Sequence, residues 1–195
     1  MKLRHNGLMA LLVGIWSAAA LAEVPALDSP GARHEAQRLA GLPPVSPAVG
    51  RIDSSGRKQQ GRASYYSRQF VHRKMADGRQ MNPQSNVAAS KSLPLGTTAK
   101  VTNLQNGRSA TVNVQDRGPY ARGRVMDVSS SVADQLDLKK HGTALVEVKP
   151  ITVPQPDGAV KLGAGAAEVT PEEVAQAAET TRRLTSIART ATSGR

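Results

Sequence analysis

Residues 101–129, VTNLQNGRSATVNVQDRGPYARGRVMDVS, decide the fold of this chain. Apolar and polar residues alternate at 98–104 and again at 109–115, and Asn106-Gly107 lies between the two segments. Alternation at period two is typical of a strand that buries one face, and an Asn-Gly pair supplies the positive φ that a tight hairpin turn requires. The pattern therefore predicts a β-hairpin. Its core-facing residues should be Ala99, Val101, Ala110, Val112 and Val114.

The residues after this hairpin predict more short strands and one helix. The sequence DRGP at 116–119 is typical of a turn, and residues 125–128 and 143–149 have the pattern of strands. Between these strands, Ser129 or Ser130 can cap a helix that runs to about residue 138. Several short strands and one helix predict a small β-barrel. The residues expected on the buried face of the helix are Val132, Ala133 and Leu136.

The composition excludes several kinds of site. The 195 residues include no cysteine, so disulfides, thiolate metal ligands and a cysteine nucleophile are ruled out. The four histidines are scattered without metal-ligand spacing, and we therefore expect no metal site and no cofactor. The formal net charge of +11 suits an anionic polymer of the cell envelope or a membrane surface. Nucleic acid is disfavoured because the lysines and arginines are dispersed. A basic surface without a specific partner remains the alternative.

The chain begins with the pattern of a secretory signal peptide over residues 1–22. A positive segment that contains Lys2 and Arg4 precedes an apolar run at 8–20 and an A-x-A cleavage site at 20–22. The apolar run is shorter than the roughly 20 residues that span a membrane. We therefore expect an exported, periplasmic protein with no stable membrane anchor after cleavage. The lack of cysteine excludes lipoprotein processing.

Two segments flank the predicted barrel domain, which we place at 61–151. Prolines and a polar run punctuate residues 23–60, and this composition predicts a disordered linker. Residues 152–195 contain early prolines and glycines and predict a flexible tail. Within this tail, the sequence TPEE at 170–173 is a capping box that would start a helix over 171–189. Such a helix could dock on an envelope or division protein, or it could be a frayed end.

Six motifs occur in the order and spacing of one known family. They are GRASYY at 61–66, AA at 88–89 followed by LPLGT at 93–97, VTNL at 101–104, NGRS at 106–109, DRGP at 116–119 and RVMDVS at 124–129. In these motifs the chain resembles the rare lipoprotein A (RlpA) family. The resemblance implies a mainly β fold, a six-stranded double-psi β-barrel with a short helix. It also implies an endolytic lytic transglycosylase that cleaves peptidoglycan glycan strands without water and leaves a 1,6-anhydro end.

Three positions depart from the pattern of that family. Where the family carries Glu and Asp in a Gly-Glu-x-Phe-Asp segment, this chain has Arg79 and Asn82, and Ser90 replaces the His of Ala-Ala-His. Of the four polar residues that the family links to activity, Asp116 remains. The resemblance therefore implies Asp116 as the acid and base of a transglycosylase. The alternative is a non-catalytic or weakly active module that binds peptidoglycan.

The chemistry of Asp116 leaves two roles open. Non-hydrolytic cleavage needs one carboxyl group, which protonates the leaving oxygen and then accepts a proton from the sugar's own 6-hydroxyl. An aspartate before Arg-Gly-Pro can instead accept backbone N–H bonds in its turn.

Other residues are candidates for binding the substrate. Asp127 could contact the glycan, or it could cap the helix that follows it. Ser90 and Asn82 could hydrogen-bond sugar groups, and Arg79 could attract a muramic acid carboxylate. Tyr65 could stack on a sugar ring. Strand alternation predicts that Tyr65 and Tyr66 point to opposite faces, so one of them should be buried in the barrel.

Overall fold

The computed structural model describes residues 51–193. The predicted signal peptide and residues 23–50 of the predicted linker lie outside this range. Among the described residues, no helix is long and apolar enough to cross a membrane. The first strand begins at Gln59, two residues before the predicted start of the domain. Just upstream, the Asp53 N–H donates to the Ser92 carbonyl at 2.7 Å, so the residues that lead into the strand lie along the barrel.

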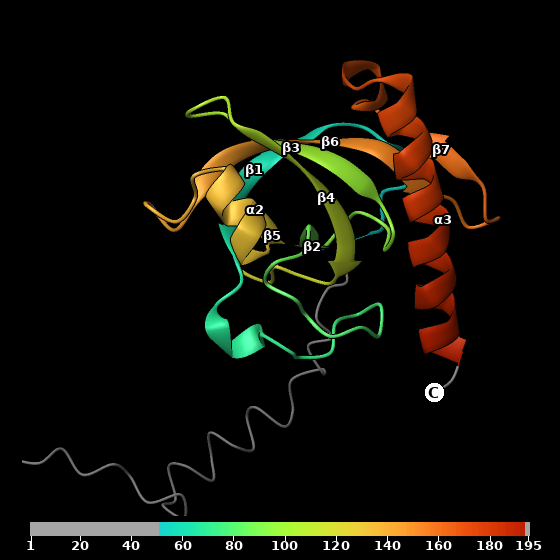
Figure 1. The fold of residues 1–195 in the computed structure, drawn as a ribbon, viewed down its shortest axis with the longest axis horizontal. Helices are drawn as coiled ribbons and strands as arrows, with labels where there is room; N and C mark the ends of the chain where they lie inside the picture. Colours follow the sequence, from blue (N-terminus) through green and yellow to red (C-terminus); the bar gives the residue numbers. More distant parts are fainter. Residues whose placement is uncertain (1–50, 194–195) are drawn as a thin grey trace, which may run out of the picture. The chain divides into compact units, whose positions relative to one another are not determined.

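Six strands form a closed barrel, which confirms the predicted fold class (Figure 1). They are β1 (Gln59–Tyr65), β2 (Val87–Ser90), β3 (Thr98–Asn103), β4 (Ser109–Asp116), β5 (Arg124–Val128) and β6 (Ala144–Pro154). Their order is β1-β5-β2-β4-β3-β6, and the barrel closes because β1 also pairs with β6. Two pairs, β1 with β5 and β2 with β4, are parallel, and the other pairs are antiparallel.

The predicted hairpin is the pair β3 and β4, with Val101 opposite Ala110. Its connection differs from a tight two-residue turn. The loop covers 104–108, Gly107 takes a φ of +73°, and Asn106 does not take a positive φ. Asn106 has a different task, because its Nδ2 donates to the Leu136 carbonyl at 3.3 Å. The loop therefore holds the carboxyl end of the following helix as well as joining two strands.

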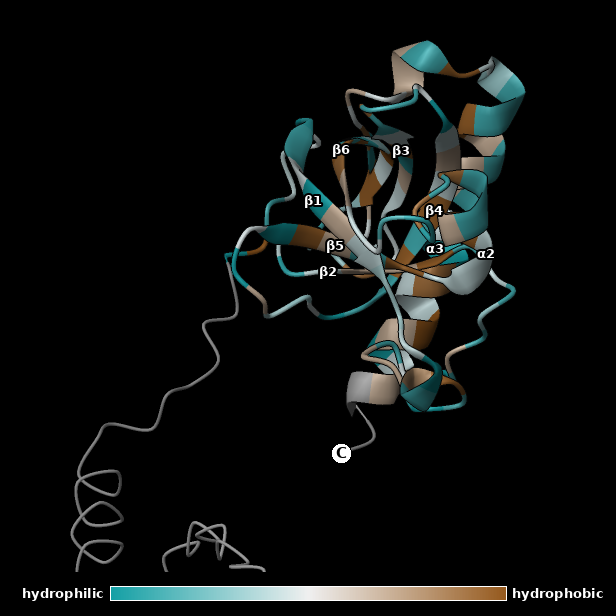
Figure 2. Ribbon diagram, turned by 90° about the vertical axis from the view of Figure 1, so that its left-hand side faces the viewer, coloured by the Kyte–Doolittle hydropathy of each residue, from teal (hydrophilic) through white to brown (hydrophobic). Residues whose placement is uncertain are grey.

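The core consists of the inward residues of the strands and of helix α2 (Ser130–Gln135). All five residues expected to face the core from the hairpin are buried, as are the three expected from the helix. Ser129 caps α2, since its Oγ accepts from the Val132 N–H. Asp127 is therefore not the cap. In Figure 2, hydrophobic positions are seen on the strands, while hydrophilic residues dominate many of the connecting loops.

The chain after β6 packs on the outside of the barrel. Strand β7 (Val160–Leu162) pairs with β6, and the short helix η2 (Ala166–Glu168) leads to helix α3 (Pro171–Ser193). The sequence predicts a flexible tail with a helix over 171–189 for this segment. In the structure, α3 has a buried side formed by Ala177, Thr181, Leu184 and Ala188. This mostly apolar stripe, with the Thr181 hydroxyl within it, packs the helix on the barrel, and an isolated helix of the same length would lack such a surface.

Candidate functional site

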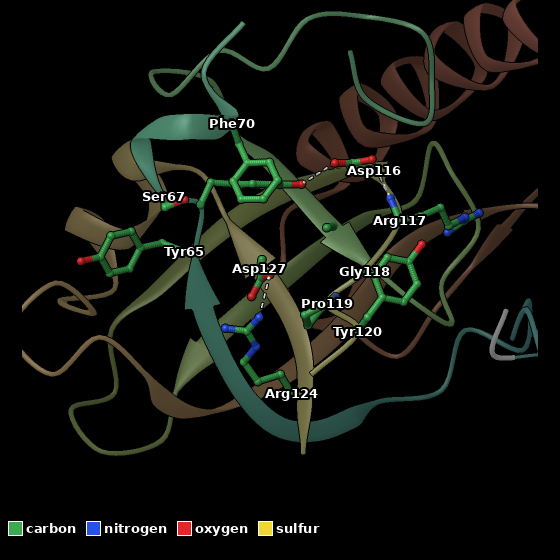
Figure 3. Close-up of a pocket in the computed structure, with 12 residues that line it drawn as sticks. Tyr65, Ser67, Phe70, Asp116, Arg117, Gly118, Pro119, Tyr120, Arg124 and Asp127 are labelled. Carbon is green, nitrogen blue, oxygen red and sulfur yellow. Dashed lines mark hydrogen bonds and ion pairs between the residues drawn. The ribbon is translucent and has the colours of Figure 1, made fainter. Parts of the chain in front are cut away.

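A cavity of about 340 Å³ lies beside the ends of β1 and β4, against residues of β2 and β5 (Figure 3). We call it the pocket. Its lining brings together the ends of these strands, the turn after β4 and the short helix η1 (Arg68–Phe70). The lining residues are Tyr65, Tyr66, Ser67, Phe70, Ala89, Asp116, Arg117, Gly118, Pro119, Tyr120, Arg124 and Asp127.

The pocket gathers the aromatic residues of the chain. The sequence contains three tyrosines, one phenylalanine and one tryptophan, and all but the tryptophan line this one cavity. The ring of Phe70 packs edge-on against Tyr66, with 5.9 Å between the ring centroids. Tyr120 is 67% exposed at the rim, so its ring is free to lie against a ligand. An aromatic-rich lining with two carboxylates suits a polar ligand that has flat apolar faces, as a sugar ring does.

Asp116 accepts three hydrogen bonds at the end of β4. Its Oδ1 accepts from the backbone N–H groups of Ala76 at 2.9 Å and Arg117 at 2.8 Å. Its Oδ2 accepts from the Tyr66 hydroxyl at 3.1 Å. The two oxygens are thus distinguished: the main chain holds Oδ1, and Oδ2 lies beside a phenol. Since a carboxylate can accept about four hydrogen bonds, capacity for a ligand remains.

Asp127 belongs to a separate network on the same wall of the pocket. Its Oδ1 accepts from the Ser64 hydroxyl at 2.5 Å, and its Oδ2 forms an ion pair with Arg124 Nη2 at 3.5 Å. Arg124 Nη1 also donates to the Ser64 oxygen at 2.8 Å. Parallel pairing of β1 with β5 places Ser64 directly beside Asp127, which explains why the network forms. The carboxylate of Asp127 is therefore neutralised by Arg124 and held by Ser64.

Tyr66 is a pocket residue whose role the sequence did not reveal. Burial, followed by the negative charge of Asp116, raises the pKa of the Tyr66 hydroxyl. Tyr66 therefore stays a neutral donor toward Asp116. Strand alternation predicted that Tyr65 and Tyr66 point to opposite faces with one of them buried in the barrel, but both are half-buried and line the pocket. The reason is that β1 ends at Tyr65, so the alternation does not extend to Tyr66.

Comparison with known proteins identifies the barrel. Residues 58–148 match the family model described as "Lytic transglycolase". These residues form an RlpA-like double-psi β-barrel domain. The match covers the barrel from the start of β1 into β6, and α3 lies beyond its end.

The chain is also similar to curated proteins named RlpA. The chain is 40% identical over 141 residues to the "Probable endolytic peptidoglycan transglycosylase RlpA" of Nostoc sp., which is 71% of this chain and 36% of that protein. It is 42% identical to the "Endolytic peptidoglycan transglycosylase RlpA" of Campylobacter jejuni, over 49% of this chain and 35% of that protein. The "Endolytic peptidoglycan transglycosylase RlpA" of Vibrio cholerae is 39% identical, over 52% of this chain and 38% of that protein. The chain thus spans little more than a third of the length of these relatives.

Three of the predicted substrate-binding residues lie outside the pocket of the RlpA-like domain. Ser90 is buried, and its Oγ accepts from the N–H groups of Ser92 and Leu93, so it anchors a turn. Asn82 is exposed, and its Oδ1 accepts from the Gln84 N–H in a local turn. Arg79 pairs with the buried Asp77, with 2.8 Å between Nη2 and Oδ2. The pocket does bring together Asp116, Asp127 and Tyr65.

Arg117 supports the RlpA-like pocket from behind. Its Nη1 donates to the carbonyls of Leu93 at 2.6 Å and Ser90 at 3.2 Å. Burial lowers the pKa of Arg117, although an arginine stays charged in proteins. Its guanidinium thus ties the turn after β4 to the turn after β2, while its backbone N–H holds Asp116.

Among the described residues, no group of three or more His, Asp or Glu side chains is arranged to hold a metal ion.

Proposed function

We propose that the protein cleaves peptidoglycan glycan strands as an endolytic lytic transglycosylase, with Asp116 as the acid and base. The observation that carries this proposal is the convergence of Tyr65, Tyr66, Phe70 and Tyr120 around a cavity that holds Asp116. The names of the relatives agree with it, and the matched region contains the whole lining of the pocket. The substrate lies in the cell envelope, where export by a signal peptide at 1–22 would deliver the protein.

The reaction needs one carboxyl group that acts twice. In the first step Asp116, in its protonated form, gives its proton to the glycosidic oxygen that leaves, and the sugar develops oxocarbenium character. In the second step the carboxylate takes the proton of the sugar's 6-hydroxyl, whose oxygen bonds to the anomeric carbon. The product is a 1,6-anhydro ring, and the protonated Asp116 is restored. No water is consumed.

The hydrogen bonds of Asp116 indicate which oxygen would carry the proton. Oδ1 already accepts two backbone N–H bonds, so a proton there would oppose both donors. Oδ2 accepts one bond, from the Tyr66 hydroxyl. We therefore assign the proton transfer to Oδ2. Tyr66 keeps its own proton because its pKa is raised, so it orients Oδ2 and does not compete as a base.

One observation favours a second candidate, a module that binds glycan strands without turning them over. Oδ1 accepts a hydrogen bond from the Arg117 N–H within its own turn, as a turn anchor does, and this is the other role that the sequence left open for Asp116. The positions at which Arg79, Asn82 and Ser90 replace family residues also lie outside the pocket. Loss of an acid or base typically lowers a rate by about 10²–10⁴-fold.

Digestion of glycan strands freed of peptides distinguishes the two candidates. Purified residues 23–195 are incubated with the strands, and the ends of the products are analysed by mass spectrometry. The transglycosylase predicts 1,6-anhydromuramic ends that disappear with Asp116→Asn. Asn preserves the shape of the side chain but cannot exchange the proton. Ser67→Ala, at the exposed rim of the same pocket, is the control for general disturbance of the lining.

The digestion has three informative outcomes. A product that persists at the wild-type rate in Asp116→Asn would exclude Asp116 as the acid. Absence of product together with sedimentation of the protein with peptidoglycan would establish the binding module. If neither product nor binding occurs, the glycan assignment itself is wrong.

A further inference from the structure

One of the three hydrogen bonds to Asp116 is donated by a hairpin outside the barrel. Residues 74–80 form this hairpin, in which Lys74 bridges to Gln80 and the Met75 N–H donates to the Arg79 carbonyl at 2.8 Å. Its tip lies on the end of β4. There the Ala76 N–H donates to Asp116 Oδ1, and the Asp77 N–H donates to the Gln115 carbonyl at 3.0 Å.

The hairpin also contributes Met75 to the packing around Tyr66, the second donor to Asp116. Met75 and Met81 form a small buried cluster with Val87, and Tyr66 packs against this cluster. The Tyr66 hydroxyl reaches Asp116 Oδ2 from that position. Two of the three hydrogen bonds to the carboxylate thus depend on where the hairpin sits.

The hairpin also meets the last turns of α3. A Cβ atom built on Gly78 would lie 2.7 Å from the Cβ of Ala191, and Gly78 has a φ of +88°. Real Cβ atoms do not approach so closely, so only glycine fits opposite Ala191. Beside this contact is a cavity of about 400 Å³ that residues of the hairpin and residues 186–191 of α3 line together. Figure 1 shows these turns of α3 beside the loop between β1 and β2.

Helix α3 is itself fixed to the barrel, so it can act as a rigid support. The buried Thr181 hydroxyl lies 2.8 Å from the Thr152 hydroxyl of β6 and 3.3 Å from the Thr98 hydroxyl of β3. Leu184, one turn later, is 2% exposed. Near the end of the helix, Arg189 Nη2 donates to the Pro156 carbonyl at 3.3 Å.

We propose that α3 is a positioning element for the pocket. Through the contact of Ala191 with Gly78, it holds the tip of the 74–80 hairpin against β4 and thereby fixes the N–H donor of Ala76 on Asp116. Ala191 is a positioning residue in this arrangement, because it touches neither the pocket nor a ligand. The inference deepens the proposed function, on which the importance of Asp116 rests. It also extends the site beyond the family-matched residues 58–148, since α3 begins at Pro171.

Hydrogen exchange of the Ala76 amide tests the proposal without relying on activity. In residues 23–195 labelled with ¹⁵N, Ala191→Leu should push the tip away and break the bond from Ala76 to Asp116. We expect exchange of the Ala76 amide to accelerate by about tenfold or more through local opening. Ala191→Gly removes the contact without adding bulk and should act in the same direction with a smaller change. The matched control is Ala175→Leu, the same substitution at an exposed position of α3.

Transglycosylase kinetics supply a second readout. If the proposed function holds, Ala191→Leu should lower kcat about tenfold, because a misplaced catalytic group slows the chemical step, and change KM little, while Ala175→Leu leaves both unchanged. Unchanged exchange at Ala76 in both Ala191 variants would overturn the positioning role. If the Ala191 variants exchange faster at Ala76 but the wild type itself shows no transglycosylase activity, the positioning role stands and the proposed function is contradicted.

Discussion

The hydroxyl of Tyr66 donates to Oδ2 of Asp116 at 3.1 Å, across 50 residues of sequence. This bond joins the end of β1 to the end of β4, two strands that are not neighbours in the barrel. It also gives the two oxygens of one carboxylate different partners, a phenol on one and backbone N–H groups on the other.

Replacing Tyr66 by phenylalanine should reveal the coupling to Asp116. The ring and its packing on Met75 and Met81 are kept, and the hydrogen bond to Oδ2 is lost. We expect a coupling free energy of about 1 kcal/mol between Tyr66→Phe and Asp116→Asn. Urea unfolding of the wild type, the two single variants and the double variant measures it. Strictly additive effects would show that the bond contributes nothing to stability.

Ser64 should contribute to stability because its hydroxyl connects two charged groups, Asp127 and Arg124. Its hydroxyl donates to Asp127 and accepts from Arg124, and the side chain is 5% exposed. Ser64→Ala leaves both partners short of one hydrogen bond in a half-buried site. We expect a loss of about 1–3 kcal/mol in the free energy of unfolding. Ser67→Ala, at an exposed position nearby, should change it by less than about 0.5 kcal/mol. Equal losses in the two variants would contradict this account.

The threonine contacts beneath α3 should stabilise the docked helix. Thr181→Val keeps the shape of the side chain and removes the hydroxyl that lies beside those of Thr98 and Thr152. The cost should be about 1–2 kcal/mol of unfolding free energy, because a buried hydroxyl on β6 loses its partner. Thr180→Val, the neighbouring half-buried position, is the control. A Thr181 variant as stable as the control would mean that the hydroxyls are unimportant for docking.

Acid should remove the contribution of Glu147 to the stability of the folded state. Hydrogen bonds from Lys149, Gln60 and Lys58 lower its pKa to about 2, from a usual value of 4.5. Because the pKa is lowered in the folded state, the stabilisation is complete above pH 4.5 and is lost as the pH falls toward 2. Glu147→Gln should therefore be less stable than the wild type at pH 6, with the difference shrinking between pH 4.5 and 2. Thermal unfolding across this range measures it, with the exposed Glu179→Gln as a control. A difference that does not depend on pH would refute the assignment.

Local patterns predicted the strands well where one face is buried. The alternation at 98–104 and 109–115 gave β3 and β4 with the right residues inward, because a strand repeats every two residues. The helix cap was predicted at Ser129 or Ser130, and the structure has it at Ser129, because a serine hydroxyl can accept the free N–H groups of the first turn. The details of the turn were not predictable. The side chain of Asn106 donates a hydrogen bond to the carbonyl of Leu136, which is 30 residues away, so the residues around the turn could not predict this contact.

The pocket was harder to predict than the fold, and the reason is distance along the chain. Asp116 and Asp127 stood out because turn and strand residues surround them. Tyr66 and Phe70 belong to one segment, and Tyr120 lies about 50 residues further along the chain, so the three come together only in the folded barrel. Ser90, Asn82 and Arg79 occupy positions that the family pattern marks. In the structure, Ser90 and Asn82 accept hydrogen bonds from nearby backbone N–H groups, and Arg79 donates to Asp77. Such local competition depends on turn geometry, which residue types alone do not specify.

The closure of the barrel by β1 also has a consequence for how the protein folds. Strand β1 finds its partners only in β5 and β6, which are the last two barrel strands to be made. Its pairing with β6 joins Gln59 to Val148, so the loop that must close spans nearly the whole domain. Contacts between residues so far apart make folding slow, because chain entropy is lost before the pairing is gained. A nascent chain that stops short of Val148 would leave β1 without its β6 partner. The walls of the pocket, which β1 helps to form, would be assembled only at the end of folding.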